Sequence, residues 1–151
     1  MRPLAILLAT GFGLGRLPVA PATWASAAVA LLLVPEAVRA PFVLGIALLV
    51  VVPLAIWASG EAERELGHDA HPIVIDEAAG MLVAVLGVGH GAGSPARFLV
   101  AAFLLFRFFD IIKLYPINHL ERLPGAWGVL LDDVGAGLYT NLILQIFLRM
   151  S

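Results

Sequence analysis

The chain has 151 residues, of which 61% are apolar and 13% are charged, whereas soluble domains average about 45–50% and about 25%. A soluble domain of this size needs a densely charged surface, so the composition indicates a membrane protein. The net charge of −2 excludes the basic stripe that nucleic-acid binding requires. The absence of cysteine excludes thiolate catalysis, disulfides and cysteine-based zinc sites.

The apolar stretches predict one all-α domain over residues 1–151, a polytopic integral membrane bundle of about four or five spans. Residues 4–14 are too few to span a bilayer and are rich in glycine, so we expect a short re-entrant or interfacial segment there. Five apolar stretches follow as expected spans: 24–34, 42–58, 78–88, 98–109 and 134–148, of which only 98–109 contains a charged residue, Arg107. Several are shorter than the usual span, so charged residues at their ends must extend the helices into the interface or a polar cavity.

The distribution of lysine and arginine predicts a topology. With five spans, five or six of these residues fall on the side of the N-terminus and three on the other side. Cytoplasmic loops carry the excess of positive charge, so we expect a cytoplasmic N-terminus. The glycine-rich segment, two pairs of adjacent acids and the segment 107–113 then share the cytoplasmic face.

Five carboxylates adjoin apolar sequence and are the first candidates for chemistry: Asp76, Glu77, Asp110, Asp132 and Asp133. Two adjacent pairs of acids would repel each other in a low-dielectric site unless a cation neutralised them. Oxygen ligands favour a hard divalent ion such as magnesium, calcium or manganese. The alternative is helix capping, because acids in a first helical turn face the positive end of the helix dipole.

Arg107, Asp110 and Lys113 are spaced at i, i+3 and i+6. Arg107 and Asp110 share one helix face, whereas Lys113 lies about 240° away from them on an unbroken helix. Either the first two form an ordinary ion pair and Lys113 reaches the interface, or Arg107 and Lys113 bind a substrate anion beside the metal. The spacing favours neither interpretation.

The glycine-rich segment also permits two interpretations. Backbone N–H groups at Gly13 and Gly15 would surround a phosphate, with Arg16 adding charge and Thr23 a hydroxyl. The segment is neither a Walker loop nor a dinucleotide fingerprint. Glycines in a membrane protein also permit close packing of neighbouring backbones, which is the other interpretation.

Four sequence blocks together resemble a known family. They read GFGLG from Gly11, IVIDEAAGM from Ile73, FRFFD from Phe106 and DDVGAG from Asp132. In this order and spacing they are similar to phosphatidylglycerophosphatase A, a family of small bacterial membrane lipid phosphatases. The resemblance implies hydrolysis of phosphatidylglycerophosphate to phosphatidylglycerol and phosphate, dependence on Mg²⁺, and a multi-pass protein of the inner membrane whose active site faces the cytoplasm.

The resemblance leads to a hypothesis for each site residue. Four acids would hold one or two Mg²⁺ ions that activate a water for attack: Asp76, Glu77, Asp132 and Asp133. Asp110 would orient the phosphate-binding groups or act as a base, and Lys113 would join these acids in catalysis. The substrate-binding group would comprise Gly13, Gly15, Arg16, Thr23, Arg107 and Lys113. The expected partners are the lipid substrate and the bilayer, without nucleic acid.

Two other classes of protein remain open. A small cation transporter or channel would use the same carboxylates as an ion pathway, although it would not explain arginines and a lysine on the same face. A structural membrane subunit would need the acids for stability alone.

Overall fold

The computed structural model describes residues 2–67, 70–88, 94–120 and 122–150, and within these ranges the chain is helical with no strand. The expected all-α class is therefore confirmed. The elements are α1 (Arg2–Ala9), η1 (Leu14–Arg16), α2 (Pro21–Leu32), η2 (Glu36–Arg39), α3 (Pro41–Leu66), α4 (Asp76–Val85), α5 (Pro95–Ile112), α6 (Ile117–Leu120) and α7 (Ala126–Met150), where η marks a 3₁₀ helix.

Local sequence explains where several helices begin and end. Pro21, Pro41 and Pro95 each open a helix, where a missing N–H group costs nothing and a fixed φ favours the first turn. Gly67 follows α3 with φ of 98°, a conformation that side chains disfavour. These residues place α2, α3 and α5 without reference to the rest of the fold.

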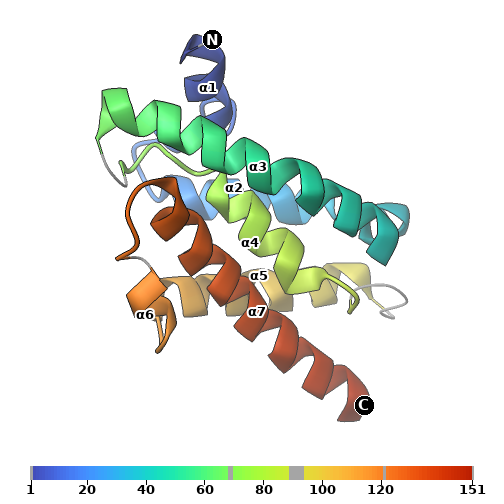
Figure 1. The fold of residues 1–151 in the computed structure, drawn as a ribbon. Helices are drawn as coiled ribbons and strands as arrows, with labels where there is room; N and C mark the ends of the chain where they lie inside the picture. The colour runs from blue at the N-terminus through green and yellow to red at the C-terminus, as the bar shows by residue number, and fades with distance from the viewer. Residues whose placement is uncertain (1, 68–69, 89–93, 121, 151) are drawn as a thin grey trace.

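The short helix α4 lies at the centre of the bundle, in contact with α2, α3, α5 and α7 (Figure 1). Its closest neighbour is α7, which crosses it where two glycines meet. A Cβ atom at Gly137 would overlap the carbonyl oxygen of Gly80, so only glycine permits this approach. Farther along α7, the buried amide of Asn141 donates hydrogen bonds to the carbonyl oxygens that end α4, those of Val83, Ala84 and Leu86.

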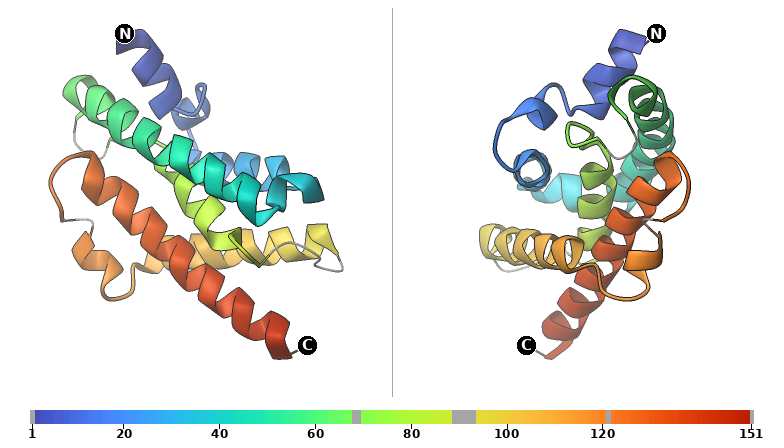
Figure 2. Two further views of the ribbon diagram at one scale, coloured as in Figure 1. Left: turned by 45° about the vertical axis from the view of Figure 1, so that its right-hand side comes forward. Right: turned by 90° about the vertical axis from the view of Figure 1, so that its left-hand side faces the viewer.

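The polar ends of four helices meet at one end of the molecule. Residues from the first turns of α2, α4 and α7 and from the last turns of α5 line the same cavity there. Since α2 begins at this end and α5 finishes at it, the two helices run antiparallel, as the two further views show (Figure 2). Four segments far apart in sequence therefore contribute to a single site.

One helix among the described residues, α3, is long and apolar enough to cross a membrane by length and composition. It has 26 residues, its most apolar 18-residue window has a mean hydropathy of 2.5, and 22% of that window is buried, unlike the core helix of a soluble protein. By contrast, α4 covers most of the expected span 78–88 with ten residues, a rise of about 15 Å against the roughly 30 Å of a hydrocarbon core. The expected number of four or five spans stays a prediction.

The outer faces of the long helices are apolar and exposed. Most of the surface of several large side chains is uncovered on α2, α3, α5 and α7, including Leu31, Phe42, Leu49, Leu104, Ile111 and Phe147. Monomeric soluble proteins rarely expose apolar surface on this scale. This surface needs an apolar environment or a partner.

The N-terminal segment is short, as expected. Helix α1 has eight residues and packs on α3 with Ala5 and Ala9 buried, whereas Leu4, Leu7 and Phe12 are exposed. Its length, about 12 Å, is insufficient to cross a bilayer. Its interfacial or re-entrant position stays a prediction.

Candidate active site

A cavity of about 260 Å³ at the polar end of the bundle brings together all five acids singled out from the sequence. Their carboxylates come from the start of α4, the end of α5 and the second turn of α7. The cavity is lined by Asp76, Glu77, Asp110, Asp132 and Asp133, with Lys113, His71 and four apolar residues completing the wall. Four of the acids are buried; Asp110 is the more accessible one.

The two pairs of adjacent acids differ in their position on their helices. Asp76 and Glu77 occupy the first turn of α4, where the helix dipole favours negative charge. Helix α7 begins at Ala126, so Asp132 and Asp133 lie beyond its first turn. Capping therefore accounts for one pair and not for the other, whose burial requires a different source of stabilisation.

Glu77 is the most highly connected acid. Its two oxygens accept hydrogen bonds from Nη1 of Arg107 at 2.8 and 3.0 Å, and Oε2 also accepts one from the Ser26 hydroxyl at 2.7 Å. The same Nη1 lies 2.9 Å from Oδ2 of Asp110. Arg107 is therefore held between two carboxylates, and the cavity wall as described includes Lys113 but not Arg107.

Lys113 reaches the site because α5 ends just before it. The residue adopts a left-handed conformation with φ of 47°, and its N–H group donates to the carbonyl of Phe109 at 2.9 Å. This conformation is costly for a residue with a side chain. It turns the lysine away from the path of an unbroken helix, and Nζ lies 2.9 Å from Oδ2 of Asp132 on α7.

The carboxylate oxygens next to these ion pairs have the character of ligands for a hard cation. One oxygen each of Glu77, Asp110 and Asp133 lies within 4.8 Å of the other two. Oδ1 of Asp76 and Oδ2 of Asp133 are buried without a hydrogen-bond partner. Buried polar atoms rarely lack partners, and oxygen atoms alone are the donor set that Mg²⁺ and Ca²⁺ prefer. The residues present therefore fit a divalent cation.

Burial makes ionisation of these acids costly. Desolvation, reinforced by the charges of Glu77 and Asp132, raises the pKa of Asp76 well above its ordinary value. Desolvation likewise raises the pKa of Glu77 to about 7, although Arg107 opposes the rise. Five carboxylates face two cations, so a further positive charge is needed to keep all of them ionised.

The oxygen cluster shares Glu77 and Asp133 with the ligand set expected from the sequence, contains Asp110 in addition, and lacks Asp76 and Asp132. The expected ligands were Asp76, Glu77, Asp132 and Asp133, whereas Asp110 joins Glu77 and Asp133 in the cluster. Asp132 is instead bound to Lys113 through Oδ2, and its Oδ1 accepts the N–H of Asp133 at 2.9 Å. Sequence spacing gave no indication of this exchange.

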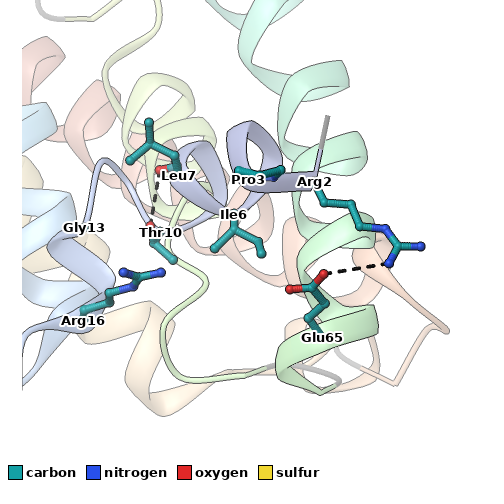
Figure 3. Close-up of a pocket in the computed structure, with 8 residues that line it drawn as sticks. All are labelled: Arg2, Pro3, Ile6, Leu7, Thr10, Gly13, Arg16 and Glu65. Carbon is teal, nitrogen blue, oxygen red and sulfur yellow. Dashed lines mark hydrogen bonds and ion pairs between the residues drawn. The ribbon is translucent and has the colours of Figure 1, made fainter.

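The glycine-rich segment lies beside a second cavity, of about 320 Å³, that does not include the acids. Gly13 and Arg16 line it together with Arg2 and Glu65 (Figure 3). Arg2 extends toward Glu65, with 4.0 Å between Nη1 and Oε1, and Arg16 approaches from the opposite wall, nearer Thr10. Gly13 and Arg16 thus line a different cavity from the five acids as described.

The other two expected phosphate-binding residues are also outside the acidic cavity. A Cβ atom at Gly15 would overlap the carbonyl oxygen of Pro72, so this glycine permits close backbone packing. Thr23 is half-buried in the first turn of α2 and lines neither of the two cavities as described.

Sequence reasoning missed Ser26. This buried residue of α2 lies one turn from Ala22 in the cavity wall and donates its hydroxyl toward Glu77. The only sequence feature that marks it is a hydroxyl inside an apolar stretch. That feature is not specific, because a serine in a helix also bonds the backbone of its own helix.

Comparison with known proteins agrees with the blocks identified in the sequence. The family described as Phosphatidylglycerophosphatase A matches residues 7–148. A protein of Bacteroides thetaiotaomicron described as a candidate phosphatidylinositol-3-phosphatase is 33% identical over 95% of this chain and 92% of its own length. Proteins described as phosphatidylglycerophosphatase A are 32% identical in Haemophilus influenzae and 28% identical in Escherichia coli, each over 91% of this chain and over 85% and 80% of their own lengths. No solved structure matches.

Proposed function

The chain belongs to the phosphatidylglycerophosphatase A family, and we propose that its acidic cavity removes the terminal phosphate of phosphatidylglycerophosphate with the help of a divalent cation. The observation that carries this proposal is the buried carboxylate cluster beside Lys113, in which two oxygens lack partners. The family name supports a hydrolase that acts on a phosphorylated lipid. The cavity supplies both kinds of group that hydrolysis of a phosphate ester needs, ligands for a cation and a positive charge for the phosphate.

The cation would be held by Glu77, Asp110 and Asp133, with Asp76 contributing its unpartnered oxygen. Mg²⁺ is our choice among the hard cations, because it binds through a few carboxylates together with water and phosphate oxygens. When bound, such an ion neutralises charge on the phosphoryl oxygens and lowers the pKa of a coordinated water. Arg107 is not part of the cavity wall as described, and it holds Glu77 and Asp110 in position through its ion pairs with both.

Lys113 is the residue that we assign to the phosphoryl oxygens. Its ammonium lines the cavity, and its position depends on the turn that ends α5 and on the bond to Asp132. Asp132 lines the cavity without belonging to the oxygen cluster, so we assign to it both the placement of Lys113 and the acceptance of the proton that the attacking water loses. Compared with the roles expected from the sequence, Asp110 and Asp132 are exchanged.

The bilayer is the environment that best accommodates the exposed apolar faces. Helix α3 qualifies as a span by itself, and two polar residues in the middle of α7, Thr140 and Asn141, are buried against the rest of the protein. Lipid contacts only the outward face of a helix, so we propose that α5 and α7 also cross the membrane. The excess of positive charge near the acidic end favours a cytoplasmic active site, where the lipid headgroup enters while its chains stay in the bilayer.

Phosphate release is the decisive measurement. Purified full-length protein in detergent should release phosphate from phosphatidylglycerophosphate when Mg²⁺ is present and stop when a chelator is added. Asp133→Asn and Lys113→Ala should each lower the rate by about 100-fold or more, because each removes a charged group that contacts the reacting phosphate or its cation. Glu61→Gln is the matched control, since Glu61 pairs with the exposed Arg64 outside the cavity.

The same preparations also discriminate between the alternatives. If folded wild-type protein releases no phosphate in the presence of metal, the proposed enzymatic activity is refuted. Full activity of Asp133→Asn would remove Asp133 from the ligand set. An ion-flux assay in liposomes tests the transporter, which nothing in the comparisons favours. Phosphatidylinositol 3-phosphate should be assayed beside phosphatidylglycerophosphate, because both present a terminal phosphate monoester on a lipid and one relative is described by activity on the former.

A further inference from the structure

The outer surface of the bundle contains an apolar groove between α2 and α5, with a volume of about 320 Å³. Every lining side chain is apolar. Its walls include Ala27, Ala30 and Leu31 of α2 and Leu99, Val100 and Phe103 of α5. The volume is at the lower end of the range for ligand pockets, roughly 300–1,000 Å³.

Along the axis of α2, the residues that line the groove follow the residues beside the acidic cavity. Ala22 lines the cavity, Ser26 bonds Glu77 at 2.7 Å, and the next residue, Ala27, lines the groove. Ala30 lies about 12 Å along the helix from Ala22. On α2, a polar contact to the acidic site therefore gives way to side chains that line the apolar groove within a single turn.

The α5 wall shows the same order in the opposite chain direction. Asp110 lines the cavity, Arg107 bonds Glu77 at 2.8 Å, and Phe103, one turn earlier, lines the groove. Because the two helices are antiparallel, the polar ends coincide and so do the apolar ends. The two cavities thus lie in sequence along the same pair of helices.

We infer that the groove holds one acyl chain of the lipid whose phosphate is hydrolysed in the acidic cavity. This inference rests on the proposed function and adds to it the site that recognises the apolar part of the substrate. A phospholipid presents a charged headgroup and then a hydrocarbon chain, the order in which the two helices pass first the acidic cavity and then the apolar groove. A hydrocarbon chain requires no hydrogen bonds, and the groove offers none.

The rim of the groove explains how a membrane lipid would enter it. Leu31 is 72% exposed and Val100 is 57% exposed, whereas Leu99 at the base is 4% exposed. The groove is therefore open along its side, so a chain passes between bilayer and groove without crossing water. Its volume suits one chain, and the second chain of the lipid stays in the bilayer.

Substitutions that fill the groove test the inference. Ala27→Phe fills it beside the acidic cavity, and Val100→Trp fills it from the exposed rim, where misfolding is a smaller risk. Leu104→Trp is the matched control for Val100→Trp. Leu104 is also on α5, has a similar exposure of 59%, and does not line the groove as described. Each protein is assayed with a long-chain phosphatidylglycerophosphate and with a dibutanoyl analogue whose chains are too short to occupy the groove.

We expect Ala27→Phe and Val100→Trp to raise KM for the long-chain lipid by about tenfold, the effect of losing roughly two buried methylene groups. The KM of these two variants for the dibutanoyl analogue should remain within about twofold of wild type, and so should the KM of Leu104→Trp for either substrate. Equal losses on both substrates would show a structural effect and overturn the inference. Unchanged KM for the long-chain lipid in both variants would also overturn it.

A measurement independent of turnover separates this inference from the proposed function. Full-length Asp133→Asn protein is reconstituted with a phosphatidylglycerophosphate that carries a photoreactive group in one acyl chain, and the labelled residues are mapped. Labelling concentrated on 27–34 and 96–103 supports the groove even if no lipid is hydrolysed. Labelling spread equally over the exposed face of α3, or crosslinking of two copies of the chain through the groove, would contradict it.

Discussion

Replacement of Gly80 by alanine tests whether the crossing of α4 and α7 determines the geometry of the site. A Cβ atom on Gly80 would lie 2.5 Å from Cε2 and 2.7 Å from Cζ of Phe106, and 2.8 Å from the backbone oxygen of Asp133. Carbon atoms in favourable contact are about 3.5–4.0 Å apart, so the neighbours must move by about 1 Å. Phe106 is fully buried, and the backbone oxygen of Asp133 is in the way as well, so part of the movement falls on α7 at Asp133.

The magnitude follows from two opposing effects. Overpacking of a core costs about 1–3 kcal/mol, whereas alanine gains about 0.5–1 kcal/mol over glycine inside a helix. The net loss in the free energy of unfolding is then between about 0 and about 2.5 kcal/mol, with a midpoint near 1 kcal/mol. For a domain of this size each kcal/mol lowers Tm by roughly 2–4 °C. A shift of about 1 Å at Asp133 should lower phosphate release by about 100-fold.

Thermal unfolding in detergent and phosphate release, measured with Gly80→Ala, test both numbers. Gly45→Ala and Gly60→Ala in α3 are the controls, because a Cβ atom at either position meets no atom within 4 Å. These two variants should unfold at the wild-type temperature or above it and keep their activity. Gly80→Ala with wild-type Tm and wild-type activity would refute the argument that the crossing tolerates only glycine.

Three further predictions concern the neighbours of the site. Arg107→Ala should lower the free energy of unfolding by about 3–5 kcal/mol, because Glu77 and Asp110 lose a buried cation, and Arg107→Lys should restore part of that stability. Denaturant titrations that give the same stability for the wild type and for Arg107→Ala would contradict this role of Arg107. Asn141→Ala should cost about 1–3 kcal/mol by leaving carbonyl oxygens of α4 unbonded, while the rate per folded molecule stays unchanged; a selective loss of rate would implicate Asn141 in the chemistry. Affinity for Mg²⁺ should rise with pH through about 7, because burial raises the pKa of Glu77 to about 7, so that below this pH a proton competes with the ion; calorimetric titrations that show an affinity independent of pH would exclude Glu77 as a ligand.

Local patterns in the sequence were sufficient for several features. Composition indicated an apolar environment, the longer helices cover most of each expected apolar stretch, and the adjacent acids were recognisable because each pair is contiguous in the chain. The acids are also the residues that the structure brings together in one cavity. Such features depend on a few neighbouring residues, so they survive without knowledge of the packing.

Local patterns in the sequence did not predict which residues of the site pair with one another. Glu77 bonds Arg107 across 30 residues and Ser26 across 51, and no periodicity relates these positions. Arg16 was grouped with the acids because it follows a glycine-rich segment, yet it lines a different cavity. Charge and spacing describe what a residue offers, whereas its distance to a partner depends on how helices cross.

The sequence by itself determined that the chain is an apolar helical protein of one family, with five acids, Arg107 and Lys113 as its candidates for chemistry. Only the tertiary structure decided that Asp110 joins the oxygen cluster and that Asp132 binds Lys113. The physical reason is that α5 ends at Ile112 and Lys113 turns toward α7 in a left-handed conformation. The crossing of α4 and α7 at two glycines then sets how close their acids approach, and that distance is a property of the packed helices rather than of any one segment.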